Sequence, residues 1–190
     1  MSDNQDFPRL VSLACHDLRT PLATVYGFAR TLTRTCELVD PAGRYVGMIE
    51  SASAQLGDLL DDLGLAARIE SGRYDPSLQE RDTLELARNA AERVEHVEAD
   101  GDGALVETDV VPVERALCGL ARAAQRHGGV ELVTIAVAGR SLSIGPVTGS
   151  AAPVVLAREV KDLGAAVALR VLAALGVQVT LDGDALRLEL

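Results

Sequence analysis

The sequence contains very little lysine. Lys161 is the single lysine, and 18 basic residues in total stand against 28 acidic ones, which gives a formal net charge of -10. A chain of this charge is repelled by nucleic-acid phosphates and by anionic lipid headgroups. We therefore expect no nucleic-acid partner and no membrane partner.

Long apolar runs and paired cysteines are also missing. No stretch approaches the roughly 20 apolar residues that a membrane-spanning helix needs. The first ten residues, MSDNQDFPRL, lack the basic and then apolar pattern of a secretory signal. The three cysteines, Cys15, Cys36 and Cys118, are odd in number and lack the paired spacing of a zinc site. These absences predict a cytoplasmic protein without a disulfide framework or a metal centre.

Apolar residues recur at helical spacing in the first third of the chain. One run covers residues 7–36 and a second covers residues 41–69, and ELVDPAG breaks the pattern between them. Pro41 suits the first turn of the second helix. Two long helices joined by a short loop form an antiparallel hairpin. Each apolar stripe is too long for the other helix alone to cover, so we expect two copies to form a dimeric four-helix bundle.

A polar, turn-rich stretch, ESGRYDPSLQER, separates this hairpin from a second region where helix and strand patterns alternate. We therefore expect a helical hairpin over residues 1–73, a linker over 74–81 and an α/β sandwich domain over 82–190. Within the second domain the patterns predict helices over 82–97, capped by Asp82, over 113–127, stopped by HGG, and over 155–175, interrupted near Gly164. They predict strands over 130–138 and 141–145, and a closing hairpin that turns at Asp182 and Gly183.

A histidine stands beside an aspartate on the first predicted helix, in the stretch SLACHDLRTPLATVYGF. The neutral imidazole of His16 is a competent nucleophile toward phosphorus, and the Asp17 carboxylate can hold the proton of the other ring nitrogen. Arg19 can offset phosphoryl charge, and Thr20 lies one turn from His16 and Asp17. Pro21 cannot donate to the carbonyl of Asp17 and its ring crowds that group, which predicts a bend just after the reactive residue.

The same residues resemble a known family. SLACHDLRTPLATVYGFARTL resembles the phosphoacceptor box of sensor histidine kinases, and YVGMIESASAQLGDLLDDLGLAARIESGR resembles the second helix of the same dimerisation and histidine-phosphotransfer (HisKA-type) domain. The resemblance covers residues 7–73. It implies that His16 is the phosphorylated histidine, that Asp17 is the adjacent acid, and that the domain is a homodimeric four-helix bundle. It also implies that Asp17 and Thr20 form the D-x-x-T pattern with which such proteins dephosphorylate a partner.

The second domain resembles the ATP-binding (GHKL) domain of histidine kinases but departs from it where the nucleotide would bind. VERALCGLARAAQRHGG resembles the helix of the asparagine box, with Gly119 and Ala123 at the two asparagine positions. In SLSIGPVTG, Ser143 stands where the family has its adenine-reading aspartate, and Val147 replaces the second glycine. The magnesium ligand and the adenine-reading carboxylate of the family are therefore missing.

The phosphate loop of the family is altered as well. The helix within VKDLGAAVALRVLAALGVQVTL retains Gly164 of the G-x-G pattern but has Asp162 at the other glycine. A carboxylate at a helix N-terminus favours the helix and opposes a triphosphate there. The chain between Gly145 and Asp162 is also too short for the usual lid. We expect a degenerate domain that binds no ATP and holds no magnesium of its own.

These observations imply a stand-alone bacterial histidine phosphotransferase of two-component signalling. In such a phosphorelay, His16 exchanges a phosphoryl group with the aspartate of a response-regulator receiver domain, and Mg²⁺ is held by the receiver. Three alternatives stay open: an ATP-dependent autokinase, a receiver phosphatase that uses Asp17 and Thr20, and a catalytically silent scaffold. His96 and His127 have no matched carboxylate or cysteine partner in the sequence and are expected at the surface.

Overall fold

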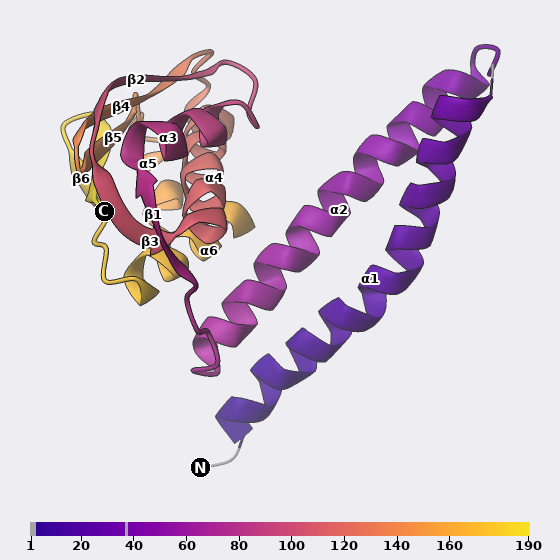
Figure 1. Cartoon of the computed structure of the whole chain (residues 1–190), viewed down its shortest axis with the longest axis horizontal. Helices are drawn as coiled ribbons and strands as arrows, with labels where there is room; N and C mark the ends of the chain where they lie inside the picture. Colours follow the sequence, from indigo (N-terminus) through magenta and orange to yellow (C-terminus); the bar gives the residue numbers. More distant parts are fainter. Residues whose placement is uncertain (1–2, 37) are drawn as a thin grey trace. The chain divides into compact units, whose positions relative to one another are not determined.

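The chain folds into two compact units, residues 1–74 and 75–190. The computed structural model describes residues 3–36 and 38–190, with side chains from residue 7 onward. The first unit is a helical hairpin and the second is an α/β domain (Figure 1). The predicted fold class is confirmed.

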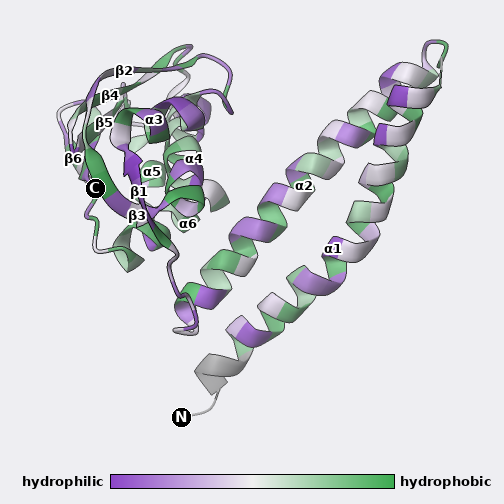
Figure 2. Ribbon diagram, viewed as in Figure 1, coloured by the Kyte–Doolittle hydropathy of each residue, from purple (hydrophilic) through white to green (hydrophobic). Residues whose placement is uncertain are grey.

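The hairpin consists of α1 (Asp3–Thr35) and α2 (Ala42–Glu70), which run side by side in opposite directions (Figure 1). Apolar residues recur along both helices (Figure 2). Pro41 lies at the N-cap of α2, one position before the first-turn place that its fixed φ suits, and its carbonyl accepts from the Tyr45 N–H. Each helix presents small or apolar residues to the other, and the buried ones are Cys15, Ala29, Ser53, Leu65 and Ala67.

A five-stranded mixed sheet organises the second unit, in the order β2-β4-β5-β7-β6. Strand β2 runs parallel to β4, and the other neighbours are antiparallel. Strands β1 and β3 form a separate antiparallel pair. The strands are β1 (Leu78–Asp82), β2 (Val97–Gly103), β3 (Leu105–Asp109), β4 (Val133–Gly139), β5 (Ser141–Gly145), β6 (Thr180–Asp182) and β7 (Ala185–Glu189), and the helices are α3 (Thr83–Ala91), α4 (Val110–Gly128), α5 (Ala152–Val155) and α6 (Leu163–Ala174).

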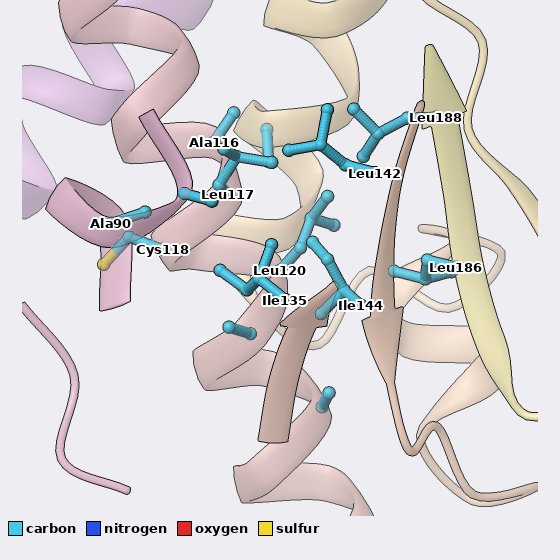
Figure 3. Packing of buried hydrophobic residues seen from close by; sticks show 14 of the residues in the cluster. Ala90, Ala116, Leu117, Cys118, Leu120, Ile135, Leu142, Ile144, Leu186 and Leu188 are labelled. Carbon is cyan, nitrogen blue, oxygen red and sulfur yellow. The ribbon is translucent and has the colours of Figure 1, made fainter. Parts of the chain in front are cut away.

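Helix α4 supplies the centre of the core. Its Leu117 and Leu120 point toward Ile135 of β4, Ile144 of β5 and Leu186 of β7, and all five side chains are fully buried (Figure 3). Burial of each such side chain stabilises the fold by about 1.5–3 kcal/mol relative to leaving it in water. The helix ends at Gly129, which adopts the left-handed conformation that favours glycine, as the HGG stretch predicts.

Three strands lie where the sequence analysis placed none, and one of them, β3, pairs with β1 in a stretch for which no element was predicted. Strand β1 occupies the second half of the predicted linker, where LQERD carries no apolar alternation and is held by its pairing with β3. The predicted helix over 82–97 ends at Ala91, and VEADGDG forms β2 instead. Asp82 caps α3 as expected, because its Oδ1 accepts from the N–H groups of Leu84 and Glu85.

The helix predicted over 155–175 is interrupted as expected, but the break lies before Gly164 and separates two helices. Helix α5 ends at Val155 and α6 begins at Leu163, so the break precedes Gly164, which lies in the first turn of α6. Asp162 caps this second helix, since its Oδ1 accepts from the Ala165 N–H at 3.0 Å. The closing hairpin turns one residue later than expected, because Asp182 pairs with Ala185 across a Gly183–Asp184 loop.

Candidate functional site

His16 and Asp17 form a contact on the surface of the hairpin. The His16 Nδ1 lies 3.2 Å from the Asp17 Oδ1, and the two side chains are 78% and 68% exposed. A carboxylate only accepts hydrogen bonds, so Nδ1 carries the proton in this contact. In the neutral ring the Nε2 atom then holds a lone pair, and the exposure leaves room for a partner protein to approach it.

Two contacts hold α1 to α2 on either side of His16 in the sequence. The buried Cys15 packs toward Gly64, where an added Cβ would lie 3.8 Å from the Cys15 Cβ. The Arg19 Nη2 donates to the Asp61 Oδ1, so this ion pair also bridges the two helices. The helical segment that carries His16 is therefore attached to α2 one position before His16 and three positions after it.

Thr20 and Pro21 complete the predicted set. Thr20 is exposed, and its carbonyl accepts from the Thr24 hydroxyl at 3.2 Å. Pro21 lies inside α1, which continues as one helix through it. Figure 1 shows the ribbon of α1 changing direction part-way along its length, and the missing N–H of an interior proline accounts for such a bend. The chemical roles of Arg19 and Thr20 stay predictions.

The two asparagine-box positions of the second unit have no free space. Ala123 of α4 is fully buried in the core. A Cβ added at Gly119 would lie 3.0 Å from the Gly164 carbonyl oxygen, so α4 and α6 meet backbone to backbone there. An asparagine at position 119 would have to push α6 away from α4.

The two positions expected near adenine, Ser143 and Val147, also make contacts that hold the second unit together. Ser143 lies on β5 and pairs with Ala136 of β4 and Arg187 of β7. Val147 is buried, and its N–H donates to the Asp184 carbonyl at 2.6 Å. Ser143 thus pairs within the sheet, and Val147 makes a backbone hydrogen bond next to the end of β5.

The buried carboxylate of Asp162 is the centre of a small polar cluster at the start of α6. Its Oδ2 lies 3.2 Å from the His127 Nε2 and 3.3 Å from the Arg126 Nη1, while the Asp162 side chain is only 7% exposed. The expectation that His127 has no carboxylate partner is therefore wrong. Its partner stands 35 residues further along the chain, a separation that no local pattern in the sequence reveals. His96 is exposed, as expected.

Large apolar side chains remain exposed along both hairpin helices. On α2, Met48 is 63% exposed, Leu56 52% and Leu59 45%. On α1, Phe28 is 68% exposed and Leu18 is 55% exposed. We call this set the apolar stripe; its further members are Leu10, Leu13, Val25, Leu32, Tyr45, Ile49 and Leu63.

A search of the described part of the chain finds no helix that is both long and apolar enough to cross a membrane. Nor do three or more histidine, cysteine, aspartate or glutamate side chains gather as a metal site anywhere among those residues.

The first unit matches a known protein family. Residues 9–72 match the His Kinase A (phospho-acceptor) domain. The probable sensor histidine kinase TcrY of Mycobacterium tuberculosis is 28% identical over 140 residues, which are 74% of this chain and 28% of that protein. The sensor protein DivL of Caulobacter vibrioides is 30% identical over 78 residues, which are 41% of this chain and 10% of that protein. The chain thus spans less than a third of either relative.

Solved structures share the folds of both units. Full-length ShkA, crystallised in complex with AMPPNP, aligns with a TM-score of 0.66 at 23% identity and covers 95% of this chain and 44% of its own. The histidine kinase AdeS of Acinetobacter baumannii aligns with a TM-score of 0.51 at 17% identity and covers 91% of this chain and 94% of its own. Residues 9–72 thus match the His Kinase A (phospho-acceptor) domain, and the chain shares its fold with these solved histidine kinase structures.

Proposed function

We propose that this chain is a histidine phosphotransferase of two-component signalling. The observation that carries the proposal is the contact between His16 Nδ1 and Asp17 Oδ1 at 3.2 Å on a ring that is 78% exposed. The contact fixes the proton on Nδ1 and leaves Nε2 as the nucleophile. Because the match to the phospho-acceptor family includes this position, His16 is the residue expected to carry the phosphoryl group.

The proposed reaction is an exchange between two side chains. The lone pair of His16 Nε2 attacks the phosphorus of an aspartyl phosphate on a receiver domain, the N–P bond forms, and the P–O bond to the aspartate breaks. The electron pair of that bond leaves with the aspartate carboxylate, and the Nδ1 proton stays with the Asp17 contact. The reverse reaction passes the group to another receiver. Mg²⁺ on the receiver would offset the charge of the phosphoryl oxygens.

This exchange needs no nucleotide on the present chain, because the phosphoryl group arrives already activated. Two features of the second unit support an ATP-independent role. The approach of Gly119 to Gly164 leaves no room for an asparagine that could hold Mg²⁺. The Asp162 carboxylate, which accepts from the Ala165 N–H, places negative charge at the α6 N-terminus, where a triphosphate would need positive potential.

We also propose that the protein acts as a homodimer. The apolar stripe runs along both helices of the hairpin and is too extensive for one hairpin to cover. A second copy presents the same stripe, and two hairpins packed through it form a four-helix bundle with a shared apolar core. The receiver would then meet His16 on the outer surface of the bundle.

The test of the function is transfer from a receiver. Receiver domains are phosphorylated on their aspartate with labelled acetyl phosphate, desalted to remove the donor, and mixed with the wild-type chain or with His16→Gln in the presence of Mg²⁺. The proposal expects label on the wild-type chain and none on His16→Gln. Equal labelling of both proteins, or no labelling of the wild type by any receiver of its organism, would contradict it.

A further inference from the structure

Arg19 is held by a carboxylate from the other helix of the hairpin. Its Nη2 donates to the Oδ1 of Asp61, a residue 42 positions later that belongs to α2. The side chains are 51% and 44% exposed, so the pair lies at the edge of the seam between the helices. An exposed pair of this kind contributes little to the free energy of folding, so stability alone does not explain why the two side chains are paired.

The pair stands beside His16. Cys15 and Arg19 are four residues apart and so lie on one face of α1, the face that meets Gly64 and Asp61 of α2. His16 precedes Arg19 by three residues, so the two side chains are neighbours on the helix surface with their Cβ atoms about 5–6 Å apart. The guanidinium held by Asp61 is therefore next to the ring that the proposed reaction phosphorylates.

We infer that Asp61 is a positioning residue for phosphoryl transfer: it keeps the Arg19 guanidinium beside His16, where the remaining N–H donors meet the phosphoryl oxygens. This inference rests on the proposed function. A guanidinium has five N–H donors in a planar fork, so a bond to one carboxylate leaves others for an anion. Because the arginine is already ordered by Asp61, less rotamer freedom is lost when the phosphoryl group arrives.

The direction of the change in transfer rate on neutralising Asp61 distinguishes this inference from a simple electrostatic effect of its charge. A carboxylate near the site that acted only through its charge would repel the phosphoryl group, and its neutralisation would accelerate transfer. If Asp61 acts by holding Arg19, its neutralisation slows transfer instead. The effect on transfer must also disappear when Arg19 is absent, because the inference has Asp61 act only through the Arg19 guanidinium.

The experiment measures the transfer rate from one pre-phosphorylated receiver at saturating concentration for the wild type, Asp61→Asn, Arg19→Ala and the double variant. We expect Asp61→Asn to slow transfer about tenfold, within the range that misplacement of a catalytic group produces, while the half-saturating receiver concentration stays unchanged. Asp61→Asn should add nothing in the Arg19→Ala background. Asp61→Glu, which keeps the carboxylate, should transfer faster than Asp61→Asn.

Glu50→Gln, an equal loss of charge on the same helix, is the matched control and should transfer like the wild type. Thermal melts and the mass in solution show whether each variant keeps its fold and its dimer. An Asp61→Asn rate equal to or above the wild-type rate, or an equal slowing in the Arg19→Ala background, overturns the inference. The proposed function survives that result as long as the wild type is labelled and His16→Gln is not.

Discussion

At the scale of single residues, the proposed reaction depends on the tautomer of the His16 imidazole ring. Asp17 selects the tautomer with the proton on Nδ1, because its carboxylate can only accept. The sequence shows this pair directly, since the partners are adjacent. The ion pairs Arg19–Asp61 and His127–Asp162 join residues 42 and 35 positions apart, so they could be found only once the fold brought the elements together.

The substitution Asp17→Asn tests the role of the carboxylate. The amide nitrogen of asparagine can donate to Nδ1, which places the ring proton on Nε2 and removes the attacking lone pair. We expect the transfer rate from a phosphorylated receiver to fall about 10²-fold or more, with the helical melt unchanged. Glu92→Gln, an exposed substitution in the second unit, serves as the control. A rate within threefold of the wild type would show that Asp17 does not set the tautomer.

Glu114 offers a stability test in the second unit. Its side chain is 6% exposed and accepts from Asn89 Nδ2 at 2.6 Å and from Arg93 Nη2 at 3.2 Å, which joins α3 to α4. Glu114→Ala leaves the Asn89 amide without this acceptor, so we expect a loss of about 1–3 kcal/mol in the free energy of unfolding by urea. The exposed Glu98→Ala should change it by less than about 0.5 kcal/mol. Equal losses in the free energy of unfolding for the two substitutions would show that the hydrogen bonds of Glu114 do not stabilise the second unit.

At the scale of elements, the helices were the most predictable part of the fold. The long apolar periodicity of α1 and α2 fixed both within a few residues. Strands β1 and β2 were missed because LQERD and VEADGDG are charged edge sequences with little apolar alternation. Strand β3 was missed because LVETD contains only two apolar residues. The break between α5 and α6 was predicted too late in the chain because the apolar residues on both sides continue at helical spacing, whereas the capping contact of Asp162 is visible only in the structure.

The approach of α4 to α6 predicts the cost of a side chain at position 119. Gly119→Ala places a methyl group 3.0 Å from the Gly164 carbonyl oxygen, so we expect a loss of about 1–3 kcal/mol in the free energy of unfolding of the second unit. Gly149→Ala, where an added Cβ meets no atom within 4 Å, is the matched control and should be near neutral. Stabilisation by Gly119→Ala would mean that the two helices are further apart than described.

The apolar stripe predicts the effect of a charge on α2. Leu59→Glu places a carboxylate where a second hairpin would pack, so we expect the mass measured by light scattering at micromolar concentration to fall from that of a dimer to that of a monomer. Ala54→Glu, an exposed substitution away from the stripe on the same helix, should leave the dimer intact. A dimeric Leu59→Glu variant would mean that the two copies meet through another surface. A monomeric wild type would contradict the proposed dimer.

At the scale of the whole molecule, chemistry and architecture are divided between the units. The hairpin carries an exposed histidine, the carboxylate that contacts it and an arginine bridged to α2. In the second unit Ala123 is buried, Gly119 closely approaches Gly164, and a carboxylate caps α6. The match to the phospho-acceptor domain and the adjacent His16–Asp17 pair could be predicted from the sequence, while the reactive role of His16 stays a prediction. The closure between α4 and α6 could not, because it depends on two glycines 45 positions apart meeting in space.

The source of the phosphoryl group is the most direct test of this account. The wild-type chain is incubated in parallel with labelled ATP and Mg²⁺ and with a labelled, pre-phosphorylated receiver and Mg²⁺, and the label on His16 is followed over time. The account predicts label from the receiver and none from ATP. Label from ATP alone would make the second unit an active kinase domain and would contradict the central claim.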